Sequence, residues 1–287
     1  MAQLNFENKW VLITGASSGL GREIARYMAK HEHANLMIAA RRKERLEALK
    51  QEIESTGNTR VEVLETDLGN KEDVDRLFEK TTAIADIYGV INNAGVTIYK
   101  ITEEADLETY EKIINVNLMA PMRLTLKFLT YFQQKGEGAI LNVTSETGLL
   151  PVPYQNAYSA SKHAIQAFTE GLYMEYRQYR KKGIFISSFA PGGIITEMIT
   201  NAGLDKKIKI DSIFNMKAET VARKAVKIFK KKKFLSVPGI LNKATVFVAR
   251  FTSRKTLARF GELIYRPPLK NDASGGQGEA PPGPPII

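Results

Sequence analysis

Strands and helices alternate along most of the chain, and this alternation predicts an α/β fold of three layers with a parallel sheet between two layers of helices. Two further observations support this class. The first apolar run is followed at once by a glycine-rich turn, and small or amide residues follow later apolar runs. No break in composition divides residues 1–240, so we expect them to form one domain.

The first unit of the predicted fold is a strand, a glycine-rich turn and a helix. Trp10-Val11-Leu12-Ile13 fits a buried strand, and a helix is expected from about Arg22 to Lys30. Glycines between them allow a tight bend and let backbone N–H groups approach a pyrophosphate at the helix start. This pattern predicts a Rossmann-type doubly wound sheet whose dinucleotide contacts come from Gly15, Ser17, Ser18, Gly19, Leu20 and Gly21.

The second strand, Asn35 to Ala40, indicates which dinucleotide binds. In NAD-binding folds of this kind, an acid near the end of this strand accepts the ribose 2′-hydroxyl. Here no acid is in place, and Arg41 and Arg42 follow the strand. A guanidinium suits a 2′-phosphate, so Arg41 favours NADP(H), while the role of Arg42 stays open. The alternative is that both arginines simply begin the charged helix at 43–55.

The next two strands also end in polar or small residues. Val61 to Glu65 alternates as a third strand, and Asp67 after it either caps a helix that begins near Lys71 or binds the adenine. Ile87 to Ile91 is a fourth strand, which leads into Asn92-Asn93-Ala94-Gly95. Such residues at the carboxyl end of a strand fit the crevice in which open α/β sheets bind ligands.

The second half of the chain continues the alternation. The expected elements are a helical stretch at 106–134, a strand at 138–144, a helix at 158–182, a strand at 184–189, a helix at 218–232 and a strand at 234–237. The segment 192–215 carries many apolar residues, which suits either covering an apolar substrate or packing on the body.

A tyrosine and a lysine in this half, Tyr158 and Lys162, lie four residues apart on one face of the expected helix. Tyrosine alone is a poor acid or base at neutral pH, because its unperturbed pKa is about 10. An ammonium beside it lowers that pKa, so the pair could exchange a proton with a substrate oxygen near pH 7. Ser145, at the end of the strand before this helix, could add a hydroxyl to the same pocket. The alternative is a pair on a helix surface with no catalytic role.

These motifs together resemble the short-chain dehydrogenase/reductase family. In chain order they are Thr14-Gly15-x-x-x-Gly19-x-Gly21, Asn92-Asn93-Ala94-Gly95, Asn117, Ser145, Tyr158-x-x-x-Lys162 and Pro191-Gly192. They cover roughly residues 8–240. Each motif is modest alone, but all of them in the correct order and spacing are specific.

The resemblance implies a role for each matching residue. Tyr158 would be the general acid in reduction and the base in oxidation, and Lys162 would lower its pKa and bind the nicotinamide ribose. Ser145 would orient and polarise the substrate carbonyl, and Asn117 would hold a water in a proton relay. The remaining cofactor contacts would come from Asn93, Ala94, Gly95, Pro191, Gly192, Ile195 and Thr196. Tyr154 is expected to form a wall of the substrate pocket.

The implied activity is that of an NADP(H)-dependent carbonyl reductase or alcohol dehydrogenase, which transfers a hydride to or from a ketone or secondary alcohol. The chain also resembles enzymes that act on lipid-like ketones of the 3-ketoacyl or steroid type. Members of the family are commonly dimers or tetramers, joined through the helices expected at 106–134 and 158–182. The alternative class is a non-catalytic NADP-binding scaffold or redox sensor, which the presence of all four catalytic residues disfavours.

Composition and charge bear on other classes of function. The chain has no cysteine, which excludes disulfides, and its three scattered histidines predict no metal site. The N-terminus has no signal-peptide pattern and no apolar run approaches the ~20 residues of a spanning helix, so a cytoplasmic protein is expected. Residues 201–287 carry 18 Lys and Arg against 6 Asp and Glu, whereas residues 1–200 carry 23 against 25. A charge confined to the last third does not predict a nucleic-acid-binding surface.

The basic last third includes two expected helices and a tail. Residues 241–268 predict a basic amphipathic helical extension of the same domain, with a break near Ser253, and residues 269–287 are Gly/Pro-rich and expected to be disordered. In one interpretation the apolar faces of the helices pack on the body or on a second subunit. In the other, residues 230–266 rest on an anionic membrane, so that the protein is peripheral to it.

Overall fold

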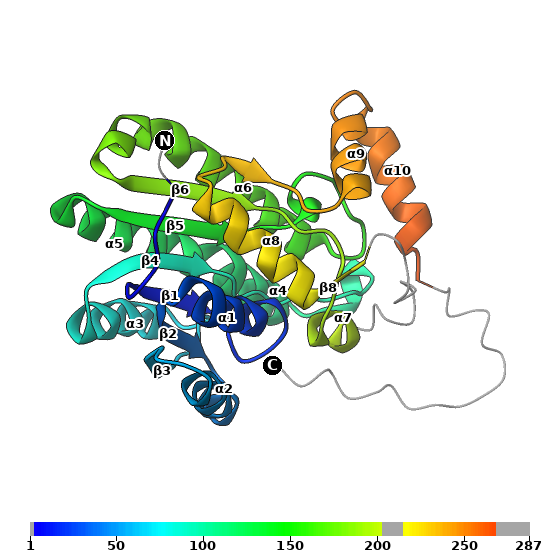
Figure 1. The fold of residues 1–287 in the computed structure, drawn as a ribbon. Coiled ribbons are helices and arrows are strands. Elements are labelled where there is room, and N and C mark those ends of the chain that lie inside the picture. The colour runs from blue at the N-terminus through cyan, green and yellow to red at the C-terminus, as the bar shows by residue number, and fades with distance from the viewer. Residues whose placement is uncertain (1–2, 203–214, 268–287) are drawn as a thin grey trace.

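The computed structural model describes residues 3–202 and 215–267. Its main sheet has seven parallel strands in the order β3-β2-β1-β4-β5-β6-β9 (Figure 1). The strands are β1 (Trp10–Thr14), β2 (Asn35–Ala40), β3 (Val61–Glu65), β4 (Ile87–Asn92), β5 (Gly138–Val143), β6 (Ile184–Phe189) and β9 (Leu235–Ser236). The predicted Rossmann-type doubly wound sheet is therefore confirmed.

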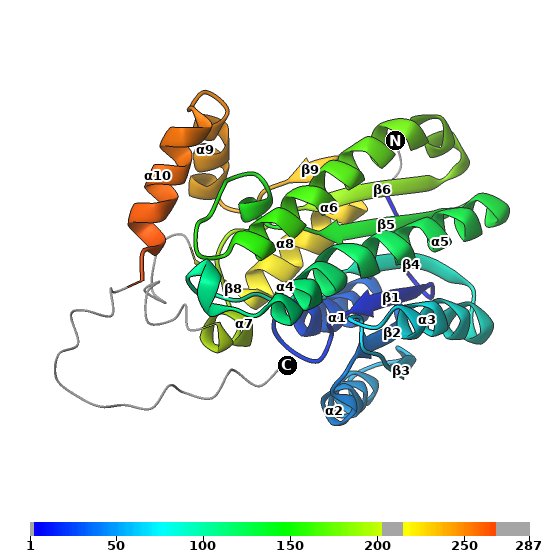
Figure 2. The same cartoon turned by 180° about the vertical axis from the view of Figure 1, so that it is seen from behind.

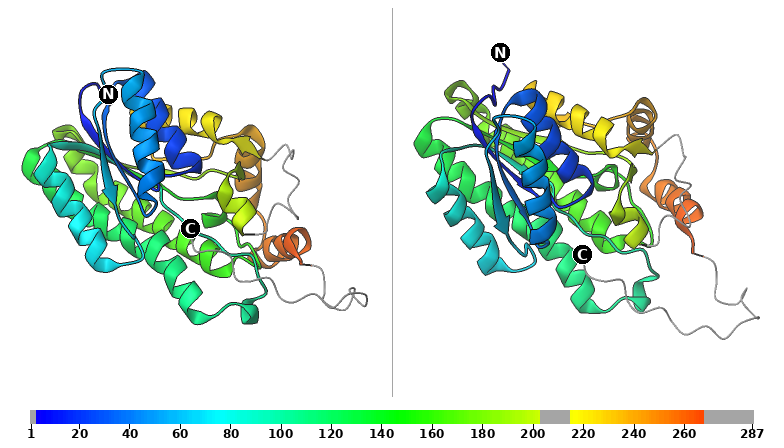
Figure 3. Two further views of the ribbon diagram at one scale, coloured as in Figure 1. Left: turned by 90° about the horizontal axis from the view of Figure 1, so that it is seen from below. Right: turned by 60° about the horizontal axis from the view of Figure 1, so that its bottom comes forward.

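Helices cover both faces of this sheet. The helices of the described residues are α1 (Gly19–Glu32), α2 (Lys43–Ser55), α3 (Lys71–Ile84), α4 (Leu107–Ile114), α5 (Ala120–Lys135), α6 (Asn156–Glu175), α7 (Glu197–Asn201), α8 (Ala218–Lys230), α9 (Ile240–Ala249) and α10 (Arg254–Tyr265). Apolar side chains of α1, α2 and α8 build the core on one face. Those of α3, α5 and α6 build the core on the other (Figures 2 and 3).

Short elements complete the fold. β7 (Ile194–Ile195) and β8 (Met216–Lys217) form a separate parallel pair. Three 3₁₀ turns lie at Thr102–Glu104, Glu146–Gly148 and Tyr176–Lys182.

The sheet reverses its winding direction at β1, which pairs with β2 on one side and β4 on the other. The crevice at such a switch point lies outside the carboxyl ends of these strands. β4 and β5 are buried along their whole length, because helices cover both faces of the sheet. The chain segments that follow β1, β4 and β5 are therefore held on rigid strands around one crevice.

Two local expectations require correction. The stretch predicted at 106–134 is helical, but a π-helical turn, Asn115–Met119, separates α4 from α5. Asp67 does not cap α3: the cap is Asn70, whose Oδ1 accepts a hydrogen bond from Asp73 N at 2.9 Å. Asp67 instead accepts a bond from Gly69 N at 2.9 Å and so shapes the turn before the helix.

The two C-terminal helices project from one end of the body (Figure 1). The predicted break at Ser253 is confirmed, because Ser253 is the N-terminal cap of α10. Its Oγ accepts a hydrogen bond from Thr256 N. Their apolar faces do not pack on the body, because most of their large apolar side chains are exposed. The other part of that expectation, packing on a second subunit, stays a prediction. Residues 268–287, expected to form a disordered tail, and residues 203–214 lie outside the described residues. None of the described helices is long and apolar enough to cross a membrane.

Candidate active site

The glycine-rich turn between β1 and α1 is shaped to hold a phosphate group. Gly15 has φ +70°, and a Cβ there would lie 2.7 Å from the Cα of Ala94. A Cβ at Gly21 would lie 2.3 Å from the carbonyl oxygen of Gly15. The capping residue of α1, Ser18, makes no side-chain cap bond, and no acid lies in the first turn of α1. The N–H groups of that turn are therefore available to an anion, which fits the pyrophosphate of a dinucleotide.

The turn is fixed to the end of β4 by Thr14. The Thr14 hydroxyl accepts hydrogen bonds from Asn93 N at 3.0 Å and Ala94 N at 3.1 Å. The Asn93 side chain donates in return to Thr14 O at 3.0 Å. These bonds hold the predicted residues Asn93 and Ala94 against the glycine turn. Sequence reasoning did not assign a role to Thr14, although it opens the glycine motif.

Both arginines after β2 lie at the rim of the crevice. Arg42 donates to the hydroxyls of Ser17 at 3.2 Å and Ser18 at 2.9 Å, and it pairs with Glu197 of α7 at 3.2 Å. Burial lowers the pKa of Arg41, whereas the nearby Asp67 carboxylate raises it. The role of Arg42 was left open by the sequence, and it is this residue that reaches across to the turn.

The Tyr158–Lys162 pair lies at the start of α6, beside the end of β5. Lys162 is buried, and its Nζ donates to the carbonyl oxygen of Val143 at 3.1 Å. The same Nζ lies 5.7 Å from the centre of the Tyr158 ring. Burial lowers the pKa of Lys162 to about 8. The lysine therefore stays largely protonated at neutral pH, and the alternative of a pair on the helix surface is excluded.

The phenol of Tyr158 responds mainly to its buried surroundings. Burial has the largest effect and raises its pKa, the nearby Ser145 and Thr147 hydroxyls lower it, and the Glu146 carboxylate raises it, so that the pKa is raised overall. The expected lowering by Lys162 is not found, since Lys162 is not among the groups that shift this pKa. Ser145 lies two residues after the end of β5 and is buried. Its effect on the Tyr158 pKa shows that the predicted serine and tyrosine come together.

Asn117 lies in the π-helical turn and joins three parts of the site. Its Oδ1 accepts from Val96 N at 2.8 Å, and its Nδ2 donates to Val96 O at 2.8 Å and Ser161 Oγ at 3.1 Å. A Cβ at Gly95 would lie 3.4 Å from Asn117 Oδ1 and 3.5 Å from Lys162 Nζ. π-Helical turns often occur at functional sites. The polar atoms of this side chain are engaged, so a water bound at this residue would be held chiefly by its backbone carbonyl.

A buried polar network supports the strand ends beneath the site. Asn142 Oδ1 accepts from Asn92 Nδ2 at 2.8 Å and from Thr125 Oγ1 at 3.3 Å, and Asn142 Nδ2 donates to Thr169 Oγ1 at 2.9 Å. The network ties β4 and β5 to α5 and α6. Sequence reasoning missed it, because these four positions are far apart in the chain.

Three further groups reach the site without having been predicted. Glu146 lies next to the candidate catalytic serine, Ser145, and burial raises its pKa to about 7. Tyr265, at the end of α10, has its pKa raised to about 12 by burial and by the nearby Glu146 and Tyr158. Asn242 of α9 approaches from the same side: a Cβ at Gly192 would lie 2.2 Å from its Nδ2 and 2.8 Å from Glu146 Oε2. The C-terminal helices therefore contribute to the wall of the catalytic pocket.

The other predicted residues surround this centre. Tyr154 donates its hydroxyl to Glu262 Oε1 of α10 at 3.0 Å, which is consistent with a pocket wall. Pro191 O accepts from Glu146 N at 2.9 Å. A Cβ at Gly19 would lie 3.1 Å from Thr196 Cγ2, so the segment after β6 closes over the glycine turn. The Leu20 side chain packs in the core, which leaves only its backbone for a cofactor. The Ile195 side chain lies outside the described part of the structure.

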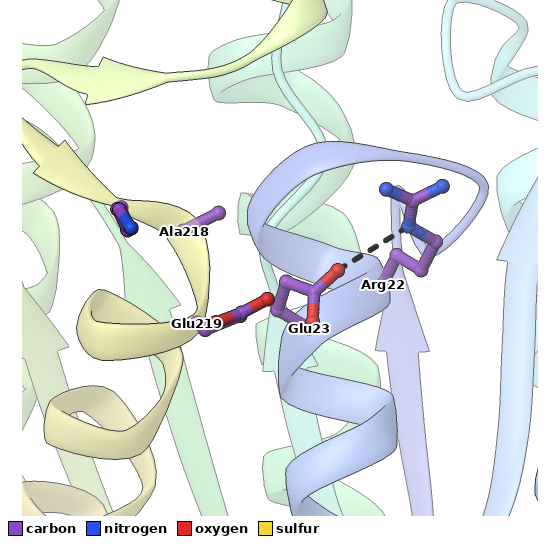
Figure 4. A pocket seen from close by; sticks show the side chains of 5 residues that line it. Arg22, Glu23, Ala218 and Glu219 are labelled. Carbon is purple, nitrogen blue, oxygen red and sulfur yellow. Dashed lines mark ion pairs between the residues drawn. The ribbon is translucent and has the colours of Figure 1, made fainter.

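A surface hollow of about 310 Å³ lies between the starts of α1 and α8. It is lined by Arg22, Glu23, Lys217, Ala218 and Glu219 (Figure 4). Arg22 and Glu23 form an ion pair at 3.4 Å across its edge. It contains none of the predicted catalytic residues.

The sheet order, the glycine turn at the start of α1 and the half-buried Tyr158 beside the buried Lys162 together indicate an oxidoreductase that uses a nicotinamide dinucleotide. Residues 9–207 match the family described as short chain dehydrogenase. The chain therefore belongs to the short-chain dehydrogenase/reductase family.

Particular relatives add detail. The very-long-chain 3-oxoacyl-CoA reductase of Anas platyrhynchos is 32% identical over 205 residues, which are 69% of this chain and 64% of that relative. The structure of a short-chain dehydrogenase from Sphingobium yanoikuyae in complex with NADPH has a TM-score of 0.74 at 27% identity and covers 86% of this chain and 97% of that one. A Burkholderia phymatum enzyme of the family, in complex with NAD, has a TM-score of 0.76 at 23% identity, covers 85% and 93%, and shows the fold alone.

Proposed function

We propose that the protein is an NADP(H)-dependent carbonyl reductase or alcohol dehydrogenase acting on a ketone or secondary alcohol. The observation that carries this proposal is the convergence of Ser145, Tyr158 and Lys162 at the end of β5, beside a turn suited to a dinucleotide. Asn117 lies next to the same lysine across Gly95. All of these groups are positioned by buried strands or helices, so their geometry is held before a substrate arrives.

The bound cofactor would supply or accept the hydride. In reduction, the hydroxyl of Ser145 would donate a hydrogen bond to the substrate carbonyl and make its carbon more electrophilic. Tyr158 would give its proton to the carbonyl oxygen as charge develops there. The Lys162 ammonium would stabilise the resulting phenolate, and a water held by the backbone of Asn117 would return a proton to it. Oxidation would use the same groups in reverse, with the Tyr158 phenolate as base.

The choice of NADP(H) over NAD(H) is proposed from the two arginines at the rim. No acid stands at the end of β2, where it would repel a 2′-phosphate, and Arg42 already contacts the hydroxyls of Ser17 and Ser18. Arg41 lies beside it and would supply a second guanidinium. The NADPH complex of the Sphingobium relative supports this preference. Asp67, next to Arg41, would contact the adenine.

A lipid-like substrate is proposed because the Anas platyrhynchos relative is a very-long-chain 3-oxoacyl-CoA reductase and because apolar C-terminal helices lie beside the pocket. The Anas platyrhynchos protein acts on a 3-oxoacyl-CoA, and the chain resembles it over most of its own length. A ketone on a long acyl chain or a steroid ring presents the carbonyl that the site is suited to reduce.

We further propose that the protein is a cytoplasmic homo-oligomer, a dimer or a tetramer. The helices expected to form its contacts carry exposed apolar side chains, namely Leu107 on α4, Leu126 on α5 and Met174 on α6. Burying such side chains in a subunit interface is favourable.

A non-catalytic NADP-binding scaffold or redox sensor is the alternative. It would not require a tyrosine held between a serine hydroxyl and a buried lysine. That arrangement favours the enzyme.

The test is the substitution Tyr158→Phe, with Tyr154→Phe as its matched control. A general acid contributes about 10²- to 10⁴-fold to rate, so Tyr158→Phe should lower turnover by that factor while NADPH affinity stays nearly unchanged. Tyr154→Phe removes only the bond to Glu262 and should retain turnover within a few-fold. Turnover is followed by NADPH absorbance with a panel of ketones and alcohols. Near-normal turnover of Tyr158→Phe would refute the mechanism.

A further inference from the structure

The outer faces of α9 and α10 expose an unusual set of apolar side chains. On α9 and the turn that follows it, Ile240, Ala244, Phe247 and Phe251 recur at a spacing that places them on one side, and Ile240 is 88% and Phe251 79% exposed. Two exposed neighbours, Leu241 and Val248, widen that face. On α10 the exposed apolar residues are Phe260, Leu263 and Ile264.

The inner faces of the same helices carry few large apolar side chains. Asn242 and Val246 are the buried residues of α9, and Val246 packs with Ala190 and Val237. On α10, a Cβ at Gly261 would lie 2.9 Å from Pro153, and Glu262 accepts a hydrogen bond from the hydroxyl of Tyr154. Most of the large apolar side chains therefore point outward, and the contacts with the body are mixed. Contiguous apolar surface of this kind marks a binding surface in a soluble protein.

Basic side chains accompany the apolar ones. Lys243, Arg250, Arg254, Lys255 and Arg259 lie on the two helices or the turn between them, and none of them forms an ion pair with another described residue. The segment 240–266 contains one acid, Glu262, and this residue is paired with Arg266 at 2.6 Å. The surface thus combines apolar side chains with five uncompensated cations.

The apolar side chains could contact either a second copy of this chain or a lipid bilayer, and the charge of the surface decides between these two. A second copy docked by two-fold symmetry would bring five cations against the same five, and like charges in one interface are unfavourable. An anionic bilayer meets both features, because its acyl region accepts apolar side chains while its phosphates attract the cations. Lysine and arginine can also extend along the apolar surface to reach those phosphates.

We propose that the outer faces of α9 and α10 dock this protein on the surface of a bilayer that contains anionic lipid. The helices lie in the plane of the boundary between headgroups and acyl chains. The apolar side chains enter that boundary, and the basic side chains lie at the phosphates. This docking does not depend on the catalytic reaction.

Docking also orients the catalytic pocket. The end of α10 accepts a hydrogen bond from Tyr99 at Tyr265 O, and Glu262 holds Tyr154 of the loop before α6. Both contacts lie beside the pocket of Tyr158. The opening of the pocket therefore lies close to the bilayer, from which a lipid-like ketone enters; this consequence rests on the proposed function.

The test is co-sedimentation of the full chain with vesicles of phosphatidylcholine, with and without phosphatidylglycerol, at low and high salt. Each lysine or arginine near such a surface contributes about 1 kcal/mol, so Lys243→Gln with Arg250→Gln should weaken binding to anionic vesicles roughly thirty-fold. Phe247→Ser with Phe251→Ser should weaken it at least about tenfold, since both rings leave the acyl boundary.

The matched controls are Lys80→Gln and Ile84→Ser on α3, whose side chains are also exposed. Both controls should bind vesicles as the natural sequence does. Melting temperature and NADPH fluorescence verify that all variants are folded.

The proposal is supported if binding requires phosphatidylglycerol, falls at high salt and is lost in the two α9 variants but not in the controls. It fails if the folded full chain ignores anionic vesicles at low salt, or if the α3 controls lose as much binding. It also fails if analytical ultracentrifugation shows that Phe247→Ser with Phe251→Ser dissociates an oligomer while vesicle binding is absent. The Tyr158→Phe variant should bind vesicles normally whether or not it loses turnover. Its two readouts therefore test the docking proposal and the catalytic proposal independently.

Discussion

Replacing Glu146 with glutamine should stabilise the protein above neutral pH. Glu146 follows Ser145 and approaches Gly192, and burial raises its pKa to about 7 from an ordinary value of 4.5. Ionising this carboxyl in the folded protein is therefore unfavourable. Glutamine has nearly the same shape and carries no charge at any pH, so the substitution removes this cost.

The magnitude and sign follow from proton binding. Between about pH 4.5 and 7 the folded protein holds a proton on Glu146 that the unfolded chain has released, so stability falls as pH rises through this window. At 1.36 kcal/mol per pH unit, the loss has an upper limit of about 3 kcal/mol. Glu146 is only partly buried, and solvent screening reduces that limit, so we expect about 1–2 kcal/mol.

The assay is urea unfolding of both proteins at pH 4 and pH 8.5. Glu146→Gln should match the natural sequence at pH 4 and exceed its free energy of unfolding at pH 8.5. The control is Glu137→Gln, which breaks a surface ion pair with Lys9 and should lower stability by at most about 1 kcal/mol. A Glu146→Gln stability difference that is zero at pH 8.5, or equal at both pH values, would refute the reasoning.

The same substitution should shift catalysis. The Glu146 carboxylate raises the pKa of Tyr158, so its removal should lower that pKa. The pH profile of kcat/KM for alcohol oxidation, which uses the phenolate, should then move to lower pH. An unchanged profile would show that Glu146 does not influence the pKa of Tyr158 during the reaction.

Three further predictions concern the cofactor site and its support. Arg41→Ala and Arg42→Ala should each weaken NADPH binding about tenfold or more while leaving NADH binding unchanged, because a charge-assisted hydrogen bond contributes roughly 1.5–3 kcal/mol. Titration of each variant with both cofactors checks this. Equal affinity of the natural protein for NADPH and NADH would contradict it. Gly21→Ala should abolish binding of either cofactor or unfold the turn, since its Cβ would lie 2.3 Å from Gly15 O, and fluorescence titration with a melting curve distinguishes the two outcomes. Asn142→Ala should lower the free energy of unfolding by about 2–5 kcal/mol in urea, because the buried groups of Asn92, Thr125 and Thr169 each lose a hydrogen bond. A loss under about 1 kcal/mol would show that the network relaxes.

The sequence alone predicted the architecture, which the structure confirms, and it supplied the candidate catalytic residues, whose roles stay predictions. Its strand predictions at 35–40, 61–65 and 184–189 coincide with β2, β3 and β6. Such strands can be predicted from the sequence because a parallel strand covered on both faces is a short continuous apolar run. The candidate catalytic pair could be predicted because the four-residue spacing of Tyr158 and Lys162 is a local property of one helix.

The tertiary structure decided every feature that depends on partners distant in the chain. It placed Arg42 rather than Arg41 against the glycine turn, through the hydroxyls of Ser17 and Ser18. It brought Tyr265 from the last helix to the catalytic pocket, more than a hundred residues from Tyr158.

The C-terminal helices show the same limit most clearly. Helical spacing in the sequence identified their apolar faces and the break at Ser253. Spacing cannot tell which face meets the body, because an apolar stripe packs equally well on a core, a second subunit or a lipid surface. The contacts of Asn242, Val246 and Glu262 with the body fixed which side of these helices faces inward and left most of their large apolar side chains exposed.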